Sequence, residues 1–251
     1  METDLNILSN NIINWIKNYA LNNNLQCLVV GVSGGVDSGL VSTLCAKTNL
    51  PTYVVSMPIN QEFFQLERAR NHCKWLEDNY ANIISLEKNL STINSLFNEI
   101  FTEFSDPLTN ANTKSRLRMI ALYQIAGCKK GIVVGTGNKV EDFGVGFYTK
   151  YGDGGVDISP IADLTKTEVR KMADILGVPK YIVNAVPTDG LWEDNRTDET
   201  QIGASYEELE WAMSYNGNEK ISDRQREVLK IYNKFNSQNK HKMTPIPIYK
   251  K

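Results

Sequence analysis

The stretch SGGVDS, residues 33–38, combines glycines, hydroxyls and one carboxylate in a pattern that can bind phosphate. Its two glycines let the backbone approach a ligand oxygen closely. A helical pattern follows, and the N–H groups at a helix N-terminus attract anions. The two serines add hydroxyl donors. The stretch therefore predicts a polyphosphate-binding turn, with a plain strand-to-helix turn as the alternative interpretation.

Asp37 is the member of this stretch that a simple phosphate site does not need. A carboxylate repels phosphate unless a cation lies between them, so Asp37 suggests a Mg²⁺ ligand. Its alternative role is to cap the helix that follows. The stretch is not the GxxxxGKS/T loop, because no lysine follows the glycines, and it is not GxGxxG.

The surrounding sequence alternates apolar strand-like runs with helical patterns. Such alternation predicts parallel strands joined by right-handed crossovers, and hence an α/β fold with a doubly wound, mainly parallel sheet flanked by helices. We expect strands at 26–32, 52–58, 81–88 and 131–138, and helices at 4–20, 38–48, 61–79, 90–104 and 111–129. Ligands bind beyond the carboxyl ends of parallel strands. The turn at 33–38 and the loop GTGN at 135–138 should therefore meet at one cleft.

The second half of the chain has a different character. Residues 143–160 are rich in glycine and predict a loop, whereas 165–179 predict a helix that begins at a threonine cap. Residues 187–201 are acidic and turn-rich, and we expect them to form a mobile loop over the cleft. Two further helices and a basic tail at 240–251 complete the chain, which we interpret as a single domain over residues 1–251.

Composition excludes several classes of protein. Hydrophobic residues make up 41% of the chain and charged residues 22%, as in globular proteins. The net charge of −2 argues against a nucleic-acid partner, and no apolar run is long enough to span a membrane. No signal-peptide pattern opens the sequence, so we expect a cytoplasmic protein. Its four cysteines form no CxxC pair and only two histidines are present, which favours free buried thiols over a zinc site.

Several motifs together resemble one enzyme family. SGGxDS resembles the pyrophosphate-binding loop of the N-type ATP pyrophosphatases. NTKSRLRM at 112–119 is similar to the NxxARxRM helix of NAD synthetases, and residues 135–160 are similar to their GTxNxxE…GxxTxxGDGxxDxxP block. LTKTEV, PTDGLW and the pair His241-Lys242 follow in the family's order. The chain thus resembles the ammonia-dependent NAD synthetases, since no glutaminase domain accompanies these motifs.

The resemblance implies a set of site residues. ATP would be bound by Gly31, Val32, Ser33, Gly34, Gly35, Val36, Asp37, Ser38, Thr136, Lys166 and Thr188. Mg²⁺ would be bound by Asp37 and Glu141, and the catalytic residues would be Asp37 and Lys166. Deamido-NAD would be bound by Arg116, Lys150, Asp157, His241 and Lys242, in part across a homodimer interface.

Considered singly, these residues have ordinary alternative interpretations. Arg116 could form an ion pair on a helix, and Lys166 could be a helix-start lysine. Asp157 could serve only to stabilise a turn, and we interpret Asp153 as a turn residue of this kind. The stretch from Glu141 to Lys150 is one residue longer than the family pattern, so Tyr148 or Thr149 could share the position of Lys150.

The resemblance implies an ATP-dependent amidation in two steps. The nicotinate carboxylate of deamido-NAD would attack ATP to form an adenylate, and ammonia would then displace AMP to give NAD. Two alternatives remain: another ligase of the ATP pyrophosphatase type, fed by a separate glutaminase, and a non-catalytic nucleotide sensor. The carboxylates Asp37 and Glu141 and the cation Lys166 favour catalysis, because a sensor need not neutralise a pyrophosphate leaving group.

Overall fold

The computed structural model describes residues 2–188, 190–192 and 196–251. Its sheet has four parallel strands in the order β3-β2-β1-β4, as expected for a doubly wound α/β fold. The strands are β1 (Cys27–Gly31), β2 (Thr52–Ser56), β3 (Ile83–Glu87) and β4 (Gly131–Val133). The two central strands, β1 and β2, are short and almost fully buried, which matches their continuous apolar runs.

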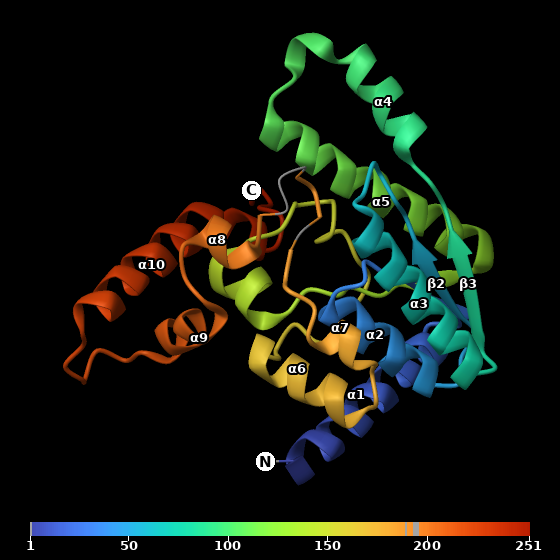
Figure 1. Cartoon of the computed structure of the whole chain (residues 1–251), viewed down its shortest axis with the longest axis horizontal. Coiled ribbons are helices and arrows are strands. Elements are labelled where there is room, and N and C mark those ends of the chain that lie inside the picture. Colours follow the sequence, from blue (N-terminus) through green and yellow to red (C-terminus); the bar gives the residue numbers. More distant parts are fainter. Residues whose placement is uncertain (1, 189, 193–195) are drawn as a thin grey trace.

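Helices cover both faces of the sheet (Figure 1). Alternate residues of β1 point to opposite faces, so Leu28 and Val30 pack in one core while Cys27 and Val29 pack in another. The first core is covered by α1 (Glu2–Asn22), α2 (Val36–Lys47), α3 (Phe63–Asn79), α6 (Lys166–Ile175) and α7 (Lys180–Val183). The second core is covered by α5 (Pro107–Lys129), which follows α4 (Ser91–Ile100) and the short helix η1 (Thr102–Phe104).

The C-terminal helices form a third core away from the sheet (Figure 1). It contains η2 (Lys139–Val145), a π-helical segment, with α8 (Asp198–Ile202), α9 (Tyr206–Ser214) and α10 (Asp223–Met243). Loops that connect this group to the sheet pass between the two parts of the molecule and line the cavity described below.

Most expected elements are present, with shifted ends. Helix α5 begins at Pro107, four residues before the expected start, because the Asp106 carboxylate accepts the N–H groups of Leu108 and Thr109 as an N-cap. Strand β4 ends at Val133 and continues only as a single bridge from Val134 to Ile158.

Three segments differ from the sequence-based expectation. The π-helical segment η2 lies in part within the expected glycine-rich loop, and α10 extends to Met243, into the expected basic tail. The expected loop at 187–201 includes helix α8, while residues 189 and 193–195 of that loop lie outside the described residues. Three cysteines are buried as expected, but Cys128 is exposed. Within the described part of the chain, no helix is both long and apolar enough to cross a membrane.

Candidate active site

The phosphate-binding turn and the GTGN loop open into one cavity of about 520 Å³, as predicted. Residues of the predicted ATP site that line it are Gly31, Val32, Ser33, Gly35, Val36, Asp37, Ser38, Thr136, Lys166 and Thr188. Gly34 is the only residue of that set outside the lining. Its φ of +87° and the Ala69 nitrogen and Gln65 oxygen, 3.0 Å from where a Cβ would lie, explain why glycine is required there.

The turn between β1 and α2 is organised without a ligand. The Ser38 hydroxyl accepts the N–H of Ser33 at 3.2 Å and donates to the carbonyl of Gly35 at 3.0 Å. Gly35 is the N-cap of α2, and in the described part of the chain no side chain caps this helix. The first N–H groups of α2 are therefore available to an anion, and the helix-cap interpretation of Asp37 is wrong.

Lys166 joins the two carboxylates that were predicted to bind a metal. Its Nζ lies 2.5 Å from Oδ2 of Asp37 and 2.8 Å from Oε1 of Glu141. The Asn138 amide donates to Oδ1 of Asp37 at 3.0 Å and so fixes the other side of that carboxylate. Lys166 is the first residue of α6, as its alternative interpretation expects, but its side chain is only 2% exposed and belongs to a buried ion cluster.

Tyr206, which the sequence analysis did not identify, extends this cluster. Its hydroxyl donates to Oε1 of Glu141 at 2.5 Å and lies 3.1 Å from Oδ2 of Asp198. The Lys166 ammonium lies 4.7 Å from the centre of the Tyr206 ring, within the range of a cation–π contact. A continuous chain of polar contacts thus runs from the phosphate-binding turn to the start of α8.

Burial and mutual attraction set the charges in the cluster. Burial raises the pKa of Asp37 more than Lys166 lowers it. Burial also acts to raise the pKa of Glu141, but Lys166 and the hydrogen bonds to Lys166 and Tyr206 outweigh it and hold that pKa below its usual value. Burial alone would lower the pKa of Lys166, yet the two carboxylates raise it, so the lysine is a cation at neutral pH.

Asp37 and Glu141 suit a magnesium ion that is also bound by phosphate. Their carboxylate oxygens converge on one point, which the Lys166 ammonium marks. Among the described residues, no group of three or more His, Cys, Asp or Glu side chains could hold a metal. Mg²⁺ is commonly held by one or two carboxylates together with substrate phosphates, so this donor set fits it.

The residues predicted to bind deamido-NAD divide into two groups. Lys242 lines the cavity, where its Nζ donates to the carbonyl of Tyr148 at 2.7 Å. Arg116, Lys150 and His241 do not line it and are linked to one another: Arg116 donates to the Lys150 carbonyl at 3.4 Å, and Lys150 Nζ donates to the His241 carbonyl at 3.0 Å.

Two aspartates of the GDGGVD stretch have different surroundings from those expected. Asp157 lies outside the cavity lining, where its carboxylate accepts the N–H of Val133 at 2.7 Å and the hydroxyl of Tyr123 at 3.0 Å. Asp153 lines the cavity. Its Oδ1 accepts the Ser115 hydroxyl at 2.7 Å, so it does more than shape a turn.

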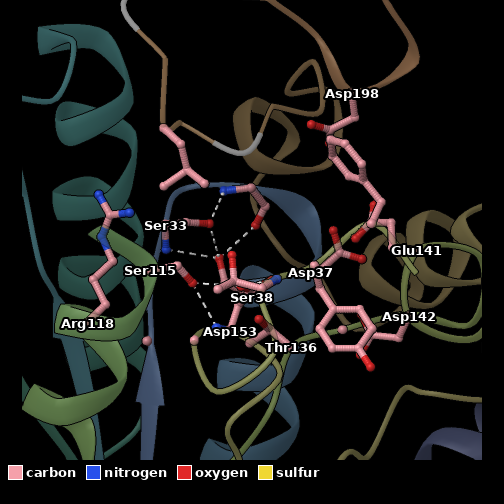
Figure 2. A pocket seen from close by; sticks show the side chains of 18 of the residues that line it. Ser33, Asp37, Ser38, Ser115, Arg118, Thr136, Glu141, Asp142, Asp153 and Asp198 are labelled. Carbon is pink, nitrogen blue, oxygen red and sulfur yellow. Dashed lines mark hydrogen bonds between the residues drawn. The ribbon is translucent and has the colours of Figure 1, made fainter. Parts of the chain in front are cut away.

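Arg118 also lines the cavity, although the sequence analysis selected Arg116 from the same helix. Figure 2 shows Arg118 on one side of Ser33 and Ser38, with Asp37 and Glu141 on the other. The Nε of Arg118 donates to the Met57 carbonyl at 3.1 Å, at the end of β2. Helical periodicity was the available signal, because the α5 residues that line the cavity follow 3.6-residue spacing: Leu108, Ala111, Asn112, Ser115, Arg118, Met119 and Leu122.

Comparison with known proteins agrees with this geometry. The family described as NAD synthase matches residues 8–246. The chain belongs to the NAD synthase family. One relative within the NAD synthase family is the NH(3)-dependent NAD(+) synthetase of Carboxydothermus hydrogenoformans, which is 34% identical over 94% of this chain and 95% of its own length.

Two solved structures of the NAD synthase fold cover nearly all of the chain. The NMN synthetase from Francisella tularensis superposes with a TM-score of 0.88 at 28% identity and covers 98% of both chains. The NH3-dependent NAD synthetase from Campylobacter jejuni, in complex with nitrate, has a TM-score of 0.78 at 24% identity and covers 98% of this chain and 99% of its own. The second likeness supports the fold alone.

Proposed function

We propose that this protein makes NAD by transferring ammonia to the nicotinate carboxylate of deamido-NAD, with cleavage of ATP to AMP and pyrophosphate. The observation that carries this proposal is the buried cluster of Lys166, Asp37 and Glu141 beside an uncapped helix N-terminus in one cavity. Such a site can hold a polyphosphate and neutralise a pyrophosphate leaving group without a covalent nucleophile.

The chemistry requires activation because a carboxylate has no good leaving group. Attack of the nicotinate carboxylate on the α-phosphorus of ATP gives an adenylate, from which ammonia can displace AMP. The first N–H groups of α2 would hold the phosphates, and Asp37 and Glu141 would hold Mg²⁺. The bound Mg²⁺ would neutralise charge that develops on the pyrophosphate.

Asp153 is our candidate for the residue that receives ammonia. At neutral pH ammonia is present chiefly as ammonium, which must lose a proton before its nitrogen can attack. A carboxylate that lines the cavity, apart from the Lys166 cluster, can bind this cation and accept its proton. Burial raises the pKa of Asp153, which favours its role as a base.

The decisive experiment is a product assay on the purified chain with ATP, Mg²⁺, ammonium and deamido-NAD. We expect one NAD per AMP, and loss of both products when ammonium and deamido-NAD are omitted together. AMP release without NAD would favour another ligase of this fold, and binding of ATP without turnover would favour a nucleotide sensor. Either result would contradict the proposal.

A mononucleotide acceptor is the second candidate. Two observations favour it: the TM-score of 0.88 with an NMN synthetase, and the position of Arg116, Lys150, Asp157 and His241 outside the cavity, although they were expected to bind the dinucleotide. Nicotinate mononucleotide carries the same carboxylate without the second nucleotide. A kcat/KM for nicotinate mononucleotide above that for deamido-NAD would establish this alternative.

We further propose a homodimer that uses the exposed apolar surface of α4, η1 and α5, which projects from the rest of the molecule (Figure 1). Ile100 and Phe104 are each 69% exposed there. The other exposed apolar residues of this surface are Ile93, Leu96, Phe97, Phe101, Leu108 and Ile120. An exposed apolar patch of this kind is more often an interface than a surface that remains in contact with solvent. Arg116 lies on α5 as well, so a partner could complete the acceptor site.

Light scattering coupled to gel filtration tests the dimer. We expect twice the monomer mass for the native chain and monomers for Ile100→Asp, which places a charge within the apolar surface. A monomeric native chain would contradict the proposal.

We place the enzyme in the cytoplasm because its buried cysteines are free thiols, as expected in a reducing compartment.

A further inference from the structure

The ammonium of Lys166 occupies the point on which the two candidate metal ligands converge. Its Nζ lies 2.5 Å from Asp37 and 2.8 Å from Glu141, so a metal ion bound by both carboxylates would need the same space. We propose that Lys166 is the resident cation of this site and excludes a divalent metal until ATP phosphates draw the ammonium away. The inference rests on the proposed ATP-dependent function.

The surroundings hold the carboxylates in place whether or not the lysine remains. The Asn138 amide fixes Asp37 at 3.0 Å, and the Tyr206 hydroxyl fixes Glu141 at 2.5 Å. The site is therefore preformed, and only the occupying cation would change. Because the Lys166 side chain is only 2% exposed, its ammonium would lose two carboxylate partners in a buried setting if it moved away with no other anion to receive it.

Charge balance explains why metal and lysine cannot both lie between the carboxylates. In the free protein one ammonium faces two carboxylates, and a divalent ion beside that ammonium would meet strong like-charge repulsion. Lys166 can leave only if another anion receives it. The phosphates of ATP, held at the N-terminus of α2, are such an anion and also supply oxygen ligands for the metal.

The consequence is an order of binding. Metal should enter the site together with ATP, while Lys166 passes from the carboxylates to the phosphates, where it can meet the charge that develops on the leaving group. Metal and nucleotide should therefore strengthen each other's binding, and removal of the lysine should reduce that coupling to the part that direct contact between metal and phosphate supplies.

Mn²⁺ binding, followed by loss of its free EPR signal, tests this order without an activity measurement. Without nucleotide we expect wild-type protein to bind Mn²⁺ at least tenfold more weakly than Lys166→Met, in which no ammonium lies between the two carboxylates. The matched control is Lys139→Met, because Lys139 forms an ion pair with the exposed Asp163, at 2.8 Å, and does not line the cavity. That variant should bind Mn²⁺ no better than wild type.

Thermal unfolding gives a second readout. Lys166→Met leaves two carboxylates unpaired and should have a lower melting temperature than wild type, which Mn²⁺ should raise again without nucleotide. The double variant Asp37→Asn/Lys166→Met should not respond to Mn²⁺. Equal Mn²⁺ affinity of wild type and Lys166→Met, both without nucleotide, would overturn the proposal.

Wild-type protein alone also decides the question if Lys166→Met fails to fold. With α,β-methylene-ATP we expect Mn²⁺ to bind at least about tenfold more tightly than without it, after correction for Mn²⁺ held by the analogue itself. Equally tight binding with and without the analogue would contradict the role of Lys166. Coupled binding without NAD formation in the product assay would refute only the proposed acceptor, and failure of the analogue to bind would overturn both proposals.

Discussion

Helix α2 contributes to two buried polar clusters that behave differently. In its first turn Asp37 joins Lys166 and Glu141, a charged cluster that lines the cavity. Further along the helix, Ser42 joins His72 of α3 in the core, where both side chains are 0% exposed. The two clusters show that burial of polar groups does not by itself mark a functional site.

The second cluster is neutral and closed. The Ser42 hydroxyl lies 2.7 Å from the Ser38 carbonyl and 2.9 Å from Nε2 of His72, and when it donates to the carbonyl, the His72 contact is made by a proton on Nε2. Among the described residues, Nδ1 of His72 has no hydrogen-bond partner, and the ring stacks on Trp75 with the two ring centres 5.5 Å apart. Burial lowers the pKa of His72 to about 4.

The first cluster differs because a ligand can change its partners. Lys166 and both carboxylates line the cavity, whereas neither Ser42 nor His72 lines it. A phosphate or a metal ion can therefore rearrange the first cluster, and only unfolding or protonation can alter the second. Changes at the first should affect turnover, and changes at the second should affect stability.

Asp37→Asn should produce the largest effect on turnover. The amide keeps the size of the side chain but removes a metal ligand and one of the two negative charges that face Lys166. We therefore expect kcat to fall by roughly 10³-fold. The fold should persist, because Glu141 still pairs with Lys166. Steady-state NAD formation and circular dichroism measure the two effects. Near-normal turnover would remove Asp37 from the metal site.

His72→Phe should leave turnover unchanged and alter the dependence of stability on pH. The folded protein favours neutral His72, whereas the unfolded chain binds a proton below pH 6.5, so stability is complete above 6.5 and falls as the pH drops toward 4. A shift from 6.5 to about 4 corresponds to a loss of about 3 kcal/mol from this residue.

Urea unfolding of wild type and His72→Phe at pH 7.5, 6 and 5 isolates this contribution from that of the carboxylates. The phenyl ring can keep the stacking on Trp75 and has no unpaired nitrogen. We expect the variant to lose less stability than wild type as the pH falls. Parallel curves for the two proteins would show that His72 does not titrate as described.

Tyr206→Phe tests the link between the charged cluster and its support. The ring beneath Lys166 remains, but Glu141 loses the hydroxyl that donates to it at 2.5 Å. Loss of a group that orients a metal ligand typically costs about 10–100-fold in metal affinity or activity, and we expect a rise of that size in the Mg²⁺ concentration required for turnover. High Mg²⁺ should restore kcat. A lower melting temperature with unchanged Mg²⁺ dependence would make Tyr206 a purely structural residue.

The sequence predicted the sheet and most helices because those signals are local. Apolar runs identified β1 and β2, and capping residues identified the start of α6. The end of β4 was predicted wrongly because strand length depends on pairing, and beyond Val133 the pairing is reduced to an isolated bridge between Val134 and Ile158. The π-helical segment η2 has no simple hydrophobic periodicity and could not be predicted from the sequence.

The site was harder to predict because its members are distant in sequence. The turn at 33–38 is continuous and could be identified from its own residues. The contact of Lys166 with Asp37 joins two elements far apart in the chain, and only the family resemblance placed Lys166 in the site. Tyr206 carried no motif and Asp198 lay in an expected loop, so the contacts of Tyr206 with Glu141 and with Asp198 became visible only in three dimensions.

Lys139→Met should have the smallest effect and completes the comparison. Its partner Asp163 is 95% exposed, and the lysine is 41% exposed, so solvent screens their attraction despite the 2.8 Å contact. We expect the free energy of unfolding to change by less than about 0.5 kcal/mol, with turnover unaffected. The distance between Lys139 and Asp163 equals that between Lys166 and Glu141. If Lys139→Met has a negligible effect and Asp37→Asn a large one, the difference between the two variants comes from burial in the cavity and not from the length of the ion pair. A loss of stability above about 1 kcal/mol would instead show that this surface pair is more than a screened contact.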